Sequence, residues 1–203
     1  MPLLDDMEAS TPLLRACHAA FDWWERWAAS RAGIGLMLVW ALAEAIVWPI
    51  FPDFLLIPMA VGNRRRFYVP LAAAVIGMAL GGTLTFLFAL WAPHQAWDVL
   101  RHIPLIHSWE INAVRSRLAT QGVAAFLFQP WSGIPFKVFA VVGGVQGLSP
   151  WLVIPTFIAA RGARMAILAT LARLLAGRFA RFVRDYSILV AALYLSLFFY
   201  IWW

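Results

Sequence analysis

The sequence predicts an all-α integral membrane protein, and three observations support this fold class. Hydrophobic residues make up 63% of the 203-residue chain, whereas charged residues make up only 13%. This composition is too apolar for a soluble domain whose surface faces water. Two long apolar segments are suited to cross a bilayer, and two others are apolar but interrupted by prolines. We therefore expect one helical bundle largely covered by lipid.

Charge and cysteine usage exclude several other classes of protein. The formal net charge is +6, and in such an apolar chain basic residues normally lie in short cytoplasmic loops that face anionic headgroups. We therefore expect no nucleic-acid partner. A single cysteine, Cys17, excludes an internal disulfide and a thiolate zinc site. The first thirty residues do not fit a cleaved signal peptide, because they lack a continuous apolar core and contain Asp5, Asp6, Glu8, Asp22 and Glu25.

Residues 1–32 are expected to form an amphipathic helix at the membrane interface. Thr11 is a suitable N-cap and Pro12 a suitable first helical residue. Apolar residues then recur with helical spacing on one face, and tryptophans follow that favour headgroup depth, namely Trp23, Trp24 and Trp27. The alternative is a helix that packs over the bundle.

Residues 33–62 are apolar but do not resemble a plain spanning helix. The segment carries Glu44 and Asp53 and is broken by Pro49 and Pro52. The arms on either side measure roughly 21 Å and roughly 12 Å at about 1.5 Å per residue. Neither arm crosses a hydrocarbon core of about 30 Å. We therefore expect a re-entrant hairpin, with a kinked single span as the alternative.

A basic turn at 64–66 follows and is expected in the cytoplasm. Residues 67–91 then contain no charge and are long enough to form a transmembrane helix. Residues 92–120 are polar and mixed in character, with Ser108 as an N-cap of a short surface helix, so we expect an interfacial loop.

The second half repeats this order of segments. Residues 121–147 are apolar and interrupted by Pro130 and Pro135, which predicts a second re-entrant hairpin. Residues 150–173 are expected to form a second transmembrane helix. The last part, 176–203, is expected to hold a basic cytoplasmic loop and a C-terminal transmembrane helix that ends in aromatic residues.

This order of segments predicts an inverted repeat in which the two hairpins face each other. A re-entrant hairpin makes no net crossing and the helix after it makes one, so the second unit begins on the opposite side of the membrane. Paired broken segments in two such halves indicate a binding site near the bilayer midplane.

Five ionisable residues lie inside the apolar segments: Glu44, Asp53, Lys137, Arg161 and Arg164. Each costs about 2.5 to 3.5 kcal/mol at mid-bilayer on insertion scales, so their presence points to function. Their charges sum to +1, which favours an anionic group such as a phosphate. Arg161 and Arg164 are one helical turn apart, and two guanidinium groups can hold one headgroup. We predict substrate binding by these arginines together with Lys137.

Glu44 and Asp53 are predicted to couple proton movement to transport or to gate it, because a partly buried carboxyl can change its protonation state. The alternative is that these carboxylates pair with the buried cations only to hold the hairpins together. The sequence predicts no catalytic residue, because no common hydrolase or nucleotide-binding motif occurs. It also predicts no metal site and no cofactor.

The proline-broken segments resemble those of the DedA family, also called the SNARE-associated or VTT-domain family, and the YqaA-like branch in particular. The first signature of that family is matched by Glu44, Pro49, Pro52 and Asp53. The second is matched by Phe128, Pro130, Pro135, Lys137, Gly143 and Gly144, and is followed by Phe157, Arg161 and Arg164. The resemblance covers about residues 33–175. Many members carry arginine where Gln129 and Lys137 stand here.

The resemblance implies two facing re-entrant hairpins in the bacterial cytoplasmic membrane and translocation of a phosphate-bearing lipid. Undecaprenyl phosphate and phospholipids are the lipids that it implies, with dependence on the proton gradient through the acidic residues. A flippase or scramblase is thus expected rather than an enzyme. The alternatives are a proton-coupled ion or small-solute transporter and a non-transporting membrane scaffold. Each of these three functions is compatible with a homo-oligomer.

Overall fold

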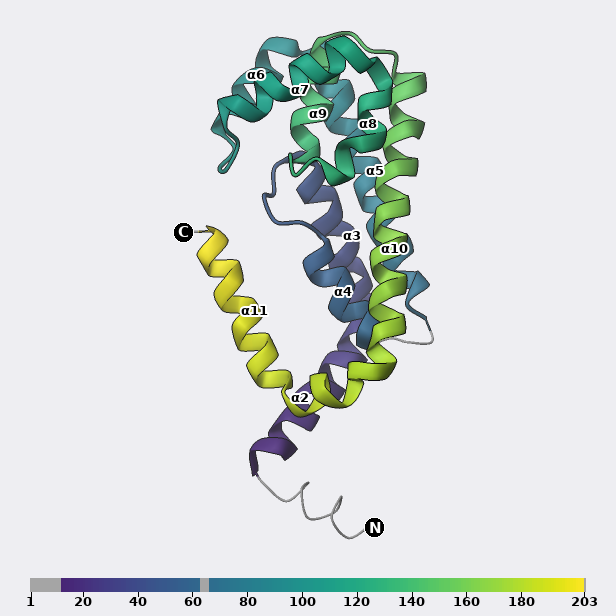
Figure 1. Ribbon diagram of the computed structural model, residues 1–203, viewed down its shortest axis with the longest axis vertical. Helices are drawn as coiled ribbons and strands as arrows, with labels where there is room; N and C mark the ends of the chain where they lie inside the picture. Colours follow the sequence, from purple (N-terminus) through teal and green to yellow (C-terminus); the bar gives the residue numbers. More distant parts are fainter. Residues whose placement is uncertain (1–11, 63–65, 203) are drawn as a thin grey trace.

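The computed structural model describes residues 12–62 and 66–202, and these residues form helices and no strand (Figure 1). This confirms the all-α prediction. Residues 1–11, 63–65 and 203 lie outside the described residues, and with them Thr11, Arg64 and Arg65. In chain order the helices are α2 (Pro12–Ala28), α3 (Arg31–Ile46), α4 (Asp53–Gly62), α5 (Tyr68–Trp91), α6 (Pro93–His102), α7 (Ser108–Gln121), η1 (Gly122–Ala124), α8 (Ala125–Phe128), η2 (Gln129–Trp131), α9 (Phe136–Val145), α10 (Pro150–Asp185) and α11 (Ser187–Trp202).

Two of the described helices are long and apolar enough to cross a membrane. They are α5 and the first 26 residues of α10, Pro150–Leu175. The consecutive helices α2 and α3 would add a third span if they are counted as one, although they are bent by 72° relative to each other. These helices indicate a membrane protein, as the composition predicts.

Helix α5 is the centre of the bundle, and its glycines allow neighbouring helices to approach closely. A Cβ added at Gly77 would collide with the carbonyl oxygen of Leu38, and one added at Gly81 would lie 2.5 Å from the carbonyl oxygen of Leu42. Residue numbers increase in the same direction along both helices at these contacts, so α3 and α5 run parallel. The hydroxyl of Thr85 also donates to the carbonyl oxygen of Ala45, at 2.9 Å.

Helices α3 and α4 form a first hairpin, residues 31–62, whose two ends lie at the same end of the molecule (Figure 1). Helix α3 ends at Ile46, residues 47–52 form the turn, and α4 returns toward α2. The return is fixed where the indole of Trp24 donates to the carbonyl oxygen of Pro58, at 3.3 Å. The turn is held by the indole of Trp40, which donates to the carbonyl oxygen of Ile50 at 3.2 Å.

A second hairpin, residues 122–145, points in the opposite direction. Its first arm consists of the short elements η1, α8 and η2, and its second arm is α9 (Figure 1). The arms pack through Phe126, whose ring centroid lies 6.5 Å from that of Phe136 and 5.8 Å from that of Phe139. Gly133 has a φ of 73° in the turn between the arms, a conformation that favours glycine.

The segment 92–120 is more helical than an interfacial loop with one short helix. Helix α7 begins at Ser108, and its N-cap is His107, whose backbone N–H donates to the Glu110 carboxylate at 2.8 Å. Helix α6 precedes it with Pro93 in its first turn. The next proline is Pro104, so no residue of helix-breaking character interrupts α6.

The C-terminal part also differs from the sequence prediction. The basic residues after 175 predict a loop, whereas α10 continues without interruption to Asp185. Arginine and alanine supply five of the ten residues from 176 to 185, and both are good helix formers. Helix α11 then turns away from α10 (Figure 1) and contacts α2 through Ser187, whose hydroxyl donates to the carbonyl oxygen of Cys17 at 2.7 Å.

The close contact between α3 and α5 makes a testable prediction about Gly77. We expect Gly77→Ala to lower the free energy of unfolding by about 1 to 3 kcal/mol, because the new methyl group forces the two helices apart. The matched control is Gly35→Ala, since a Cβ at Gly35 meets no atom within 4 Å. Thermal unfolding in detergent measures both, and equal melting temperatures for the two variants would contradict this packing.

Candidate functional site

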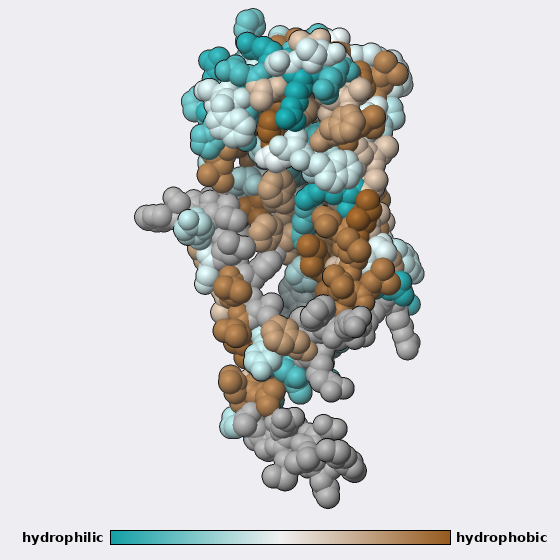
Figure 2. All heavy atoms as spheres, in the orientation of Figure 1, coloured by the Kyte–Doolittle hydropathy of each residue, from teal (hydrophilic) through white to brown (hydrophobic). Residues whose placement is uncertain are grey.

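The five ionisable residues of the apolar segments meet where the two hairpin tips face each other. Glu44 lies near the end of α3 and Asp53 begins α4, whereas Lys137 is the second residue of α9. Arg161 and Arg164 lie in the middle of α10, which runs past both tips (Figure 1). Most of the cluster is buried, and the surface in Figure 2 is hydrophilic mainly over the upper end of the molecule. Residues distant in sequence thus form one cluster.

A buried ion pair joins α3 to α10. The Arg161 guanidinium donates to the Glu44 carboxylate at 2.7 Å. Only 6% of the arginine side chain and 1% of the glutamate side chain are exposed. Two charges removed from solvent to this degree are tolerated only as partners, so this contact sets how the first hairpin lies against α10.

A second ion pair lies one helical turn further along α10. Arg164 contacts the Asp53 carboxylate at 2.6 Å, and 29% of the arginine side chain is exposed. Arg161 and Arg164 therefore share one face of α10, as their spacing predicts. Each arginine holds a different carboxylate of the first hairpin.

Lys137 connects the two hairpin tips directly. Its Nζ donates to the carbonyl oxygen of Trp48 at 2.7 Å, and the residue is only 2% exposed. The ammonium group also interacts electrostatically with Glu44 and Arg161. Among the described residues it forms no ion pair with a carboxylate of its own. The cluster therefore contains two neutralised arginines and one buried cation whose charge is not matched.

Phe136 belongs to the cluster although the sequence pattern predicts no role for it. The Arg161 guanidinium lies over its ring, 4.6 Å from the centroid. The ring is fully buried and also packs against Phe157, with centroids 4.8 Å apart. A Cβ at Gly82 would lie 2.8 Å from the Phe136 ring, so this glycine leaves the space that the ring occupies. In the sequence, only its position next to Lys137 indicates that Phe136 belongs to the cluster.

The prolines shape both tips. Pro49 and Pro52 lie in the turn of the first hairpin, Pro130 lies in η2, and Pro135 directly precedes α9. Because a helix leaves its last carbonyl groups without helical partners, the end of α3 offers acceptors at the tip. The carbonyl oxygen of Trp48, just beyond α3, is the one that Lys137 uses. Backbone as well as side chains thus contributes to the site.

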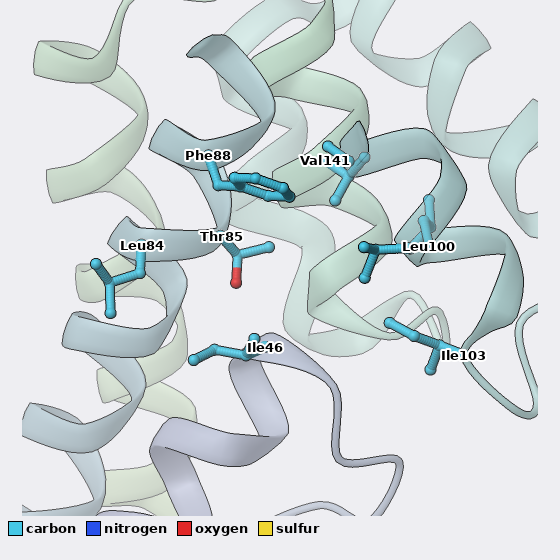
Figure 3. Close-up of a pocket in the computed structure, with 9 residues that line it drawn as sticks. Ile46, Leu84, Thr85, Phe88, Leu100, Ile103 and Val141 are labelled. Atoms are coloured by element: carbon cyan, nitrogen blue, oxygen red, sulfur yellow. The ribbon is translucent and has the colours of Figure 1, made fainter. Parts of the chain in front are cut away.

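An apolar hollow lies beside this cluster, between the end of α3, α5, α6 and α9. Its volume is about 240 Å³, and Figure 3 shows Phe88 and Val141 above it, Thr85 and Leu100 beside it, and Ile46 and Ile103 below it. Ile46 lies two residues after Glu44, which places it about 200° around the helix and away from the ion pairs. The hollow suits an aliphatic group and contributes no charge to the site.

Comparison with known proteins gives similarity without a family assignment. No family model matches the chain, and no solved structure matches it. The chain is 28% identical over 159 residues to an uncharacterized protein of Haemophilus influenzae. The aligned region covers 75% of this chain and 78% of that protein. It is 27% identical over 171 residues to an uncharacterized protein of Histophilus somni, with coverage of 81% and 85%.

The buried pair makes a testable prediction about stability. We expect Glu44→Ala and Arg161→Ala each to lower the free energy of unfolding by about 3 to 5 kcal/mol, because each leaves an uncompensated buried charge. The double variant should lose clearly less than the sum of the two. Denaturant unfolding in micelles provides the measurement.

The control for this cycle is the exposed pair between Asp22 and Arg184, whose atoms are 3.4 Å apart. Both side chains are almost half exposed, so their coupling should be at most about 1 kcal/mol. An interaction energy for Glu44 and Arg161 no larger than that of this surface pair would show that the buried contact does not hold the bundle together.

Proposed function

We propose that this protein is a membrane transporter that moves a phosphate-bearing lipid across the bilayer. The observation that carries the proposal is the cluster between the hairpin tips. Five ionisable side chains from three separate apolar segments converge there, and one of them, Lys137, is a buried cation that no carboxylate neutralises among the described residues. A site of net positive charge within an apolar bundle attracts an anionic headgroup.

The geometry supports a re-entrant arrangement of both hairpins in the bilayer. Helices α3 and α4 contain 16 and 10 residues, or roughly 24 Å and 15 Å at about 1.5 Å per residue. Both are shorter than a hydrocarbon core of about 30 Å. The hairpins point toward each other from opposite ends, and α5 and α10 run antiparallel beside them, as an inverted repeat requires. The irregular backbone of each tip then lies at mid-bilayer, buried in protein.

The ion pairs link headgroup binding to protons. In this structure Glu44 and Asp53 contact the guanidinium groups of Arg161 and Arg164, which a phosphate would use. Protonation of either carboxyl removes its negative charge and releases a guanidinium for the ligand. We therefore propose that a phosphate first contacts Lys137 and then competes with the two carboxylates, so that anion binding and proton binding support each other.

The lipid classes follow from the resemblance to the DedA family, in which undecaprenyl phosphate and phospholipids are transported. The apolar hollow beside α3 is suited to an aliphatic chain of such a lipid. A proton-coupled carrier of a small anion would use the same cationic cluster. A scaffold protein would use neither this cluster nor the apolar hollow. Transport assays with lipid and soluble phosphates separate these functions.

The re-entrant arrangement is tested by cysteine labelling in a Cys17→Ala background. Leu13, Tyr68 and Arg117 are exposed positions that suit single cysteines. We expect cysteines at Leu13 and Tyr68 to react with an impermeant reagent from the cytoplasmic side, and one at Arg117 to react from the other side. Labelling of Tyr68→Cys and Arg117→Cys from the same side would rule out the inverted repeat. Opposite sides for Leu13→Cys and Tyr68→Cys would instead indicate that α2 and α3 cross together.

The headgroup site is tested by lipid translocation in liposomes. We expect Lys137→Ala to slow translocation of a phosphate lipid by about tenfold or more, because it removes a charge-assisted hydrogen bond. Arg161→Lys and Arg164→Lys should have smaller effects than the corresponding alanine variants, since lysine keeps the charge and loses the fork. Dye-labelled phospholipids and a polyprenyl phosphate serve as substrates.

The control for these variants is Arg173→Ala, on the same helix but outside the cluster, where the guanidinium lies over Phe67. It should translocate lipid as the parent does. If all cluster variants fold and also translocate lipid at the parent rate, the cluster has a structural role only and the proposed mechanism is wrong.

A further inference from the structure

Each hairpin tip contains a buried hydrogen-bond acceptor that has no donor. These atoms are Oδ1 of Asp53 at the first tip and Oε1 of Gln129 at the second, and neither has a partner among the described residues. Gln129 is only 5% exposed and Asp53 only 8%. Buried polar atoms are almost always hydrogen-bonded, so two such atoms at facing tips need a common explanation.

The orientation of the Gln129 amide is defined by its surroundings. Its Nε2 donates to the carbonyl oxygen of Ile134 at 3.1 Å. If the amide were rotated by 180°, its oxygen would face that carbonyl oxygen, and two acceptors would repel each other. The Oε1 atom is therefore the atom left without a partner. Ile134 lies only three residues before Lys137, so this acceptor belongs to the same tip as the unmatched cation.

Asp53 is in a comparable position on the first hairpin. One carboxylate oxygen contacts Arg164 at 2.6 Å, whereas the other is buried and accepts no hydrogen bond from the described residues. An ionised carboxylate gains most when both oxygens accept from donors. The site as a whole is thus incomplete in two ways: it has a cation without an anion and acceptors without donors.

We propose that the transported headgroup carries a hydrogen-bond donor, a hydroxyl or a primary ammonium, next to its phosphate, and that Gln129 selects for this donor. The inference rests on the proposed function. Lys137 and the arginines receive the phosphate, and Oε1 of Gln129 and Oδ1 of Asp53 receive the donor. A phosphate lipid without a donor leaves these acceptors empty, and a buried acceptor that is desolvated without a partner weakens binding.

The test compares headgroups that differ only in their donors. Phosphatidylethanolamine, its N-methyl and N,N-dimethyl derivatives and phosphatidylcholine share one phosphate but lose their N–H donors stepwise. With identical acyl chains in liposomes, we expect translocation by the full-length protein to fall along the series, by about tenfold between the first and last members. Phosphatidylglycerol distinguishes the donors: if it moves as fast as phosphatidylethanolamine a hydroxyl suffices, and if it moves as slowly as phosphatidylcholine an ammonium is required.

Variants of Gln129 test the selecting residue through a ratio that a structural role would not change. Gln129→Glu keeps acceptors and should increase the preference for phosphatidylethanolamine over phosphatidylcholine. Gln129→Arg offers only donors and should bring this ratio close to one. The matched control is Gln146→Leu, because Gln146 is an exposed glutamine directly after the same hairpin, with its Nε2 3.5 Å from the carbonyl oxygen of Arg115. It should leave the ratio unchanged.

The outcomes separate this inference from the function on which it rests. Equal translocation of all four lipids by the parent protein, or an unchanged ratio in folded Gln129 variants, would overturn the donor selection while transport itself remains. Absence of translocation for every phosphate lipid would overturn the proposed function and this inference with it. If the Gln129 variants do not fold, the methylation series in the parent protein decides alone.

Discussion

The ion pair between Arg161 and Glu44 is the contact on which the arrangement of the hairpins depends. It joins residues 117 positions apart, and both side chains are almost completely buried. A shift of α10 by one helical turn would move each arginine about 5.4 Å and leave at least one arginine and one carboxylate of the two pairs without a partner. The cost of that separation defines the axial position of α10 against the first hairpin. Arg164 and Asp53, one turn further on, fix the same register.

The second hairpin is positioned by what surrounds this pair. The Phe136 ring lies under the Arg161 guanidinium, and the absence of a side chain at Gly82 lets α5 accommodate that ring. Lys137 follows in sequence and is thereby brought to the carbonyl oxygen of Trp48 on the opposite tip. Charge, aromatic packing and one missing side chain thus act together.

The same contacts that hold the tips together compete with the proposed ligand. Both arginines contact carboxylates, so among the described residues of the cluster only Lys137 would be unmatched for an incoming anion. In the proposed mechanism such a site would discriminate against weakly charged solutes, because displacement of a carboxylate requires a strong anion or a proton. The unfilled acceptors of Asp53 and Gln129 add a second requirement on the ligand. The residues that hold the tips together are thus also the ones to which we assign selectivity.

Local patterns along the chain are sufficient to predict much of this protein. Apolar composition, proline position and residue spacing indicate the helical class, the span from residue 67 to 91, the breaks at the tips and the five charges in apolar segments. These properties act over a few residues, so they can be recognised in a sequence. The extent of α10, the role of Phe136, the pairing of each arginine with its carboxylate and the unfilled acceptors are decided only by tertiary structure. They depend on how helices about a hundred residues apart are placed against one another, and packing, rather than local sequence, determines that placement.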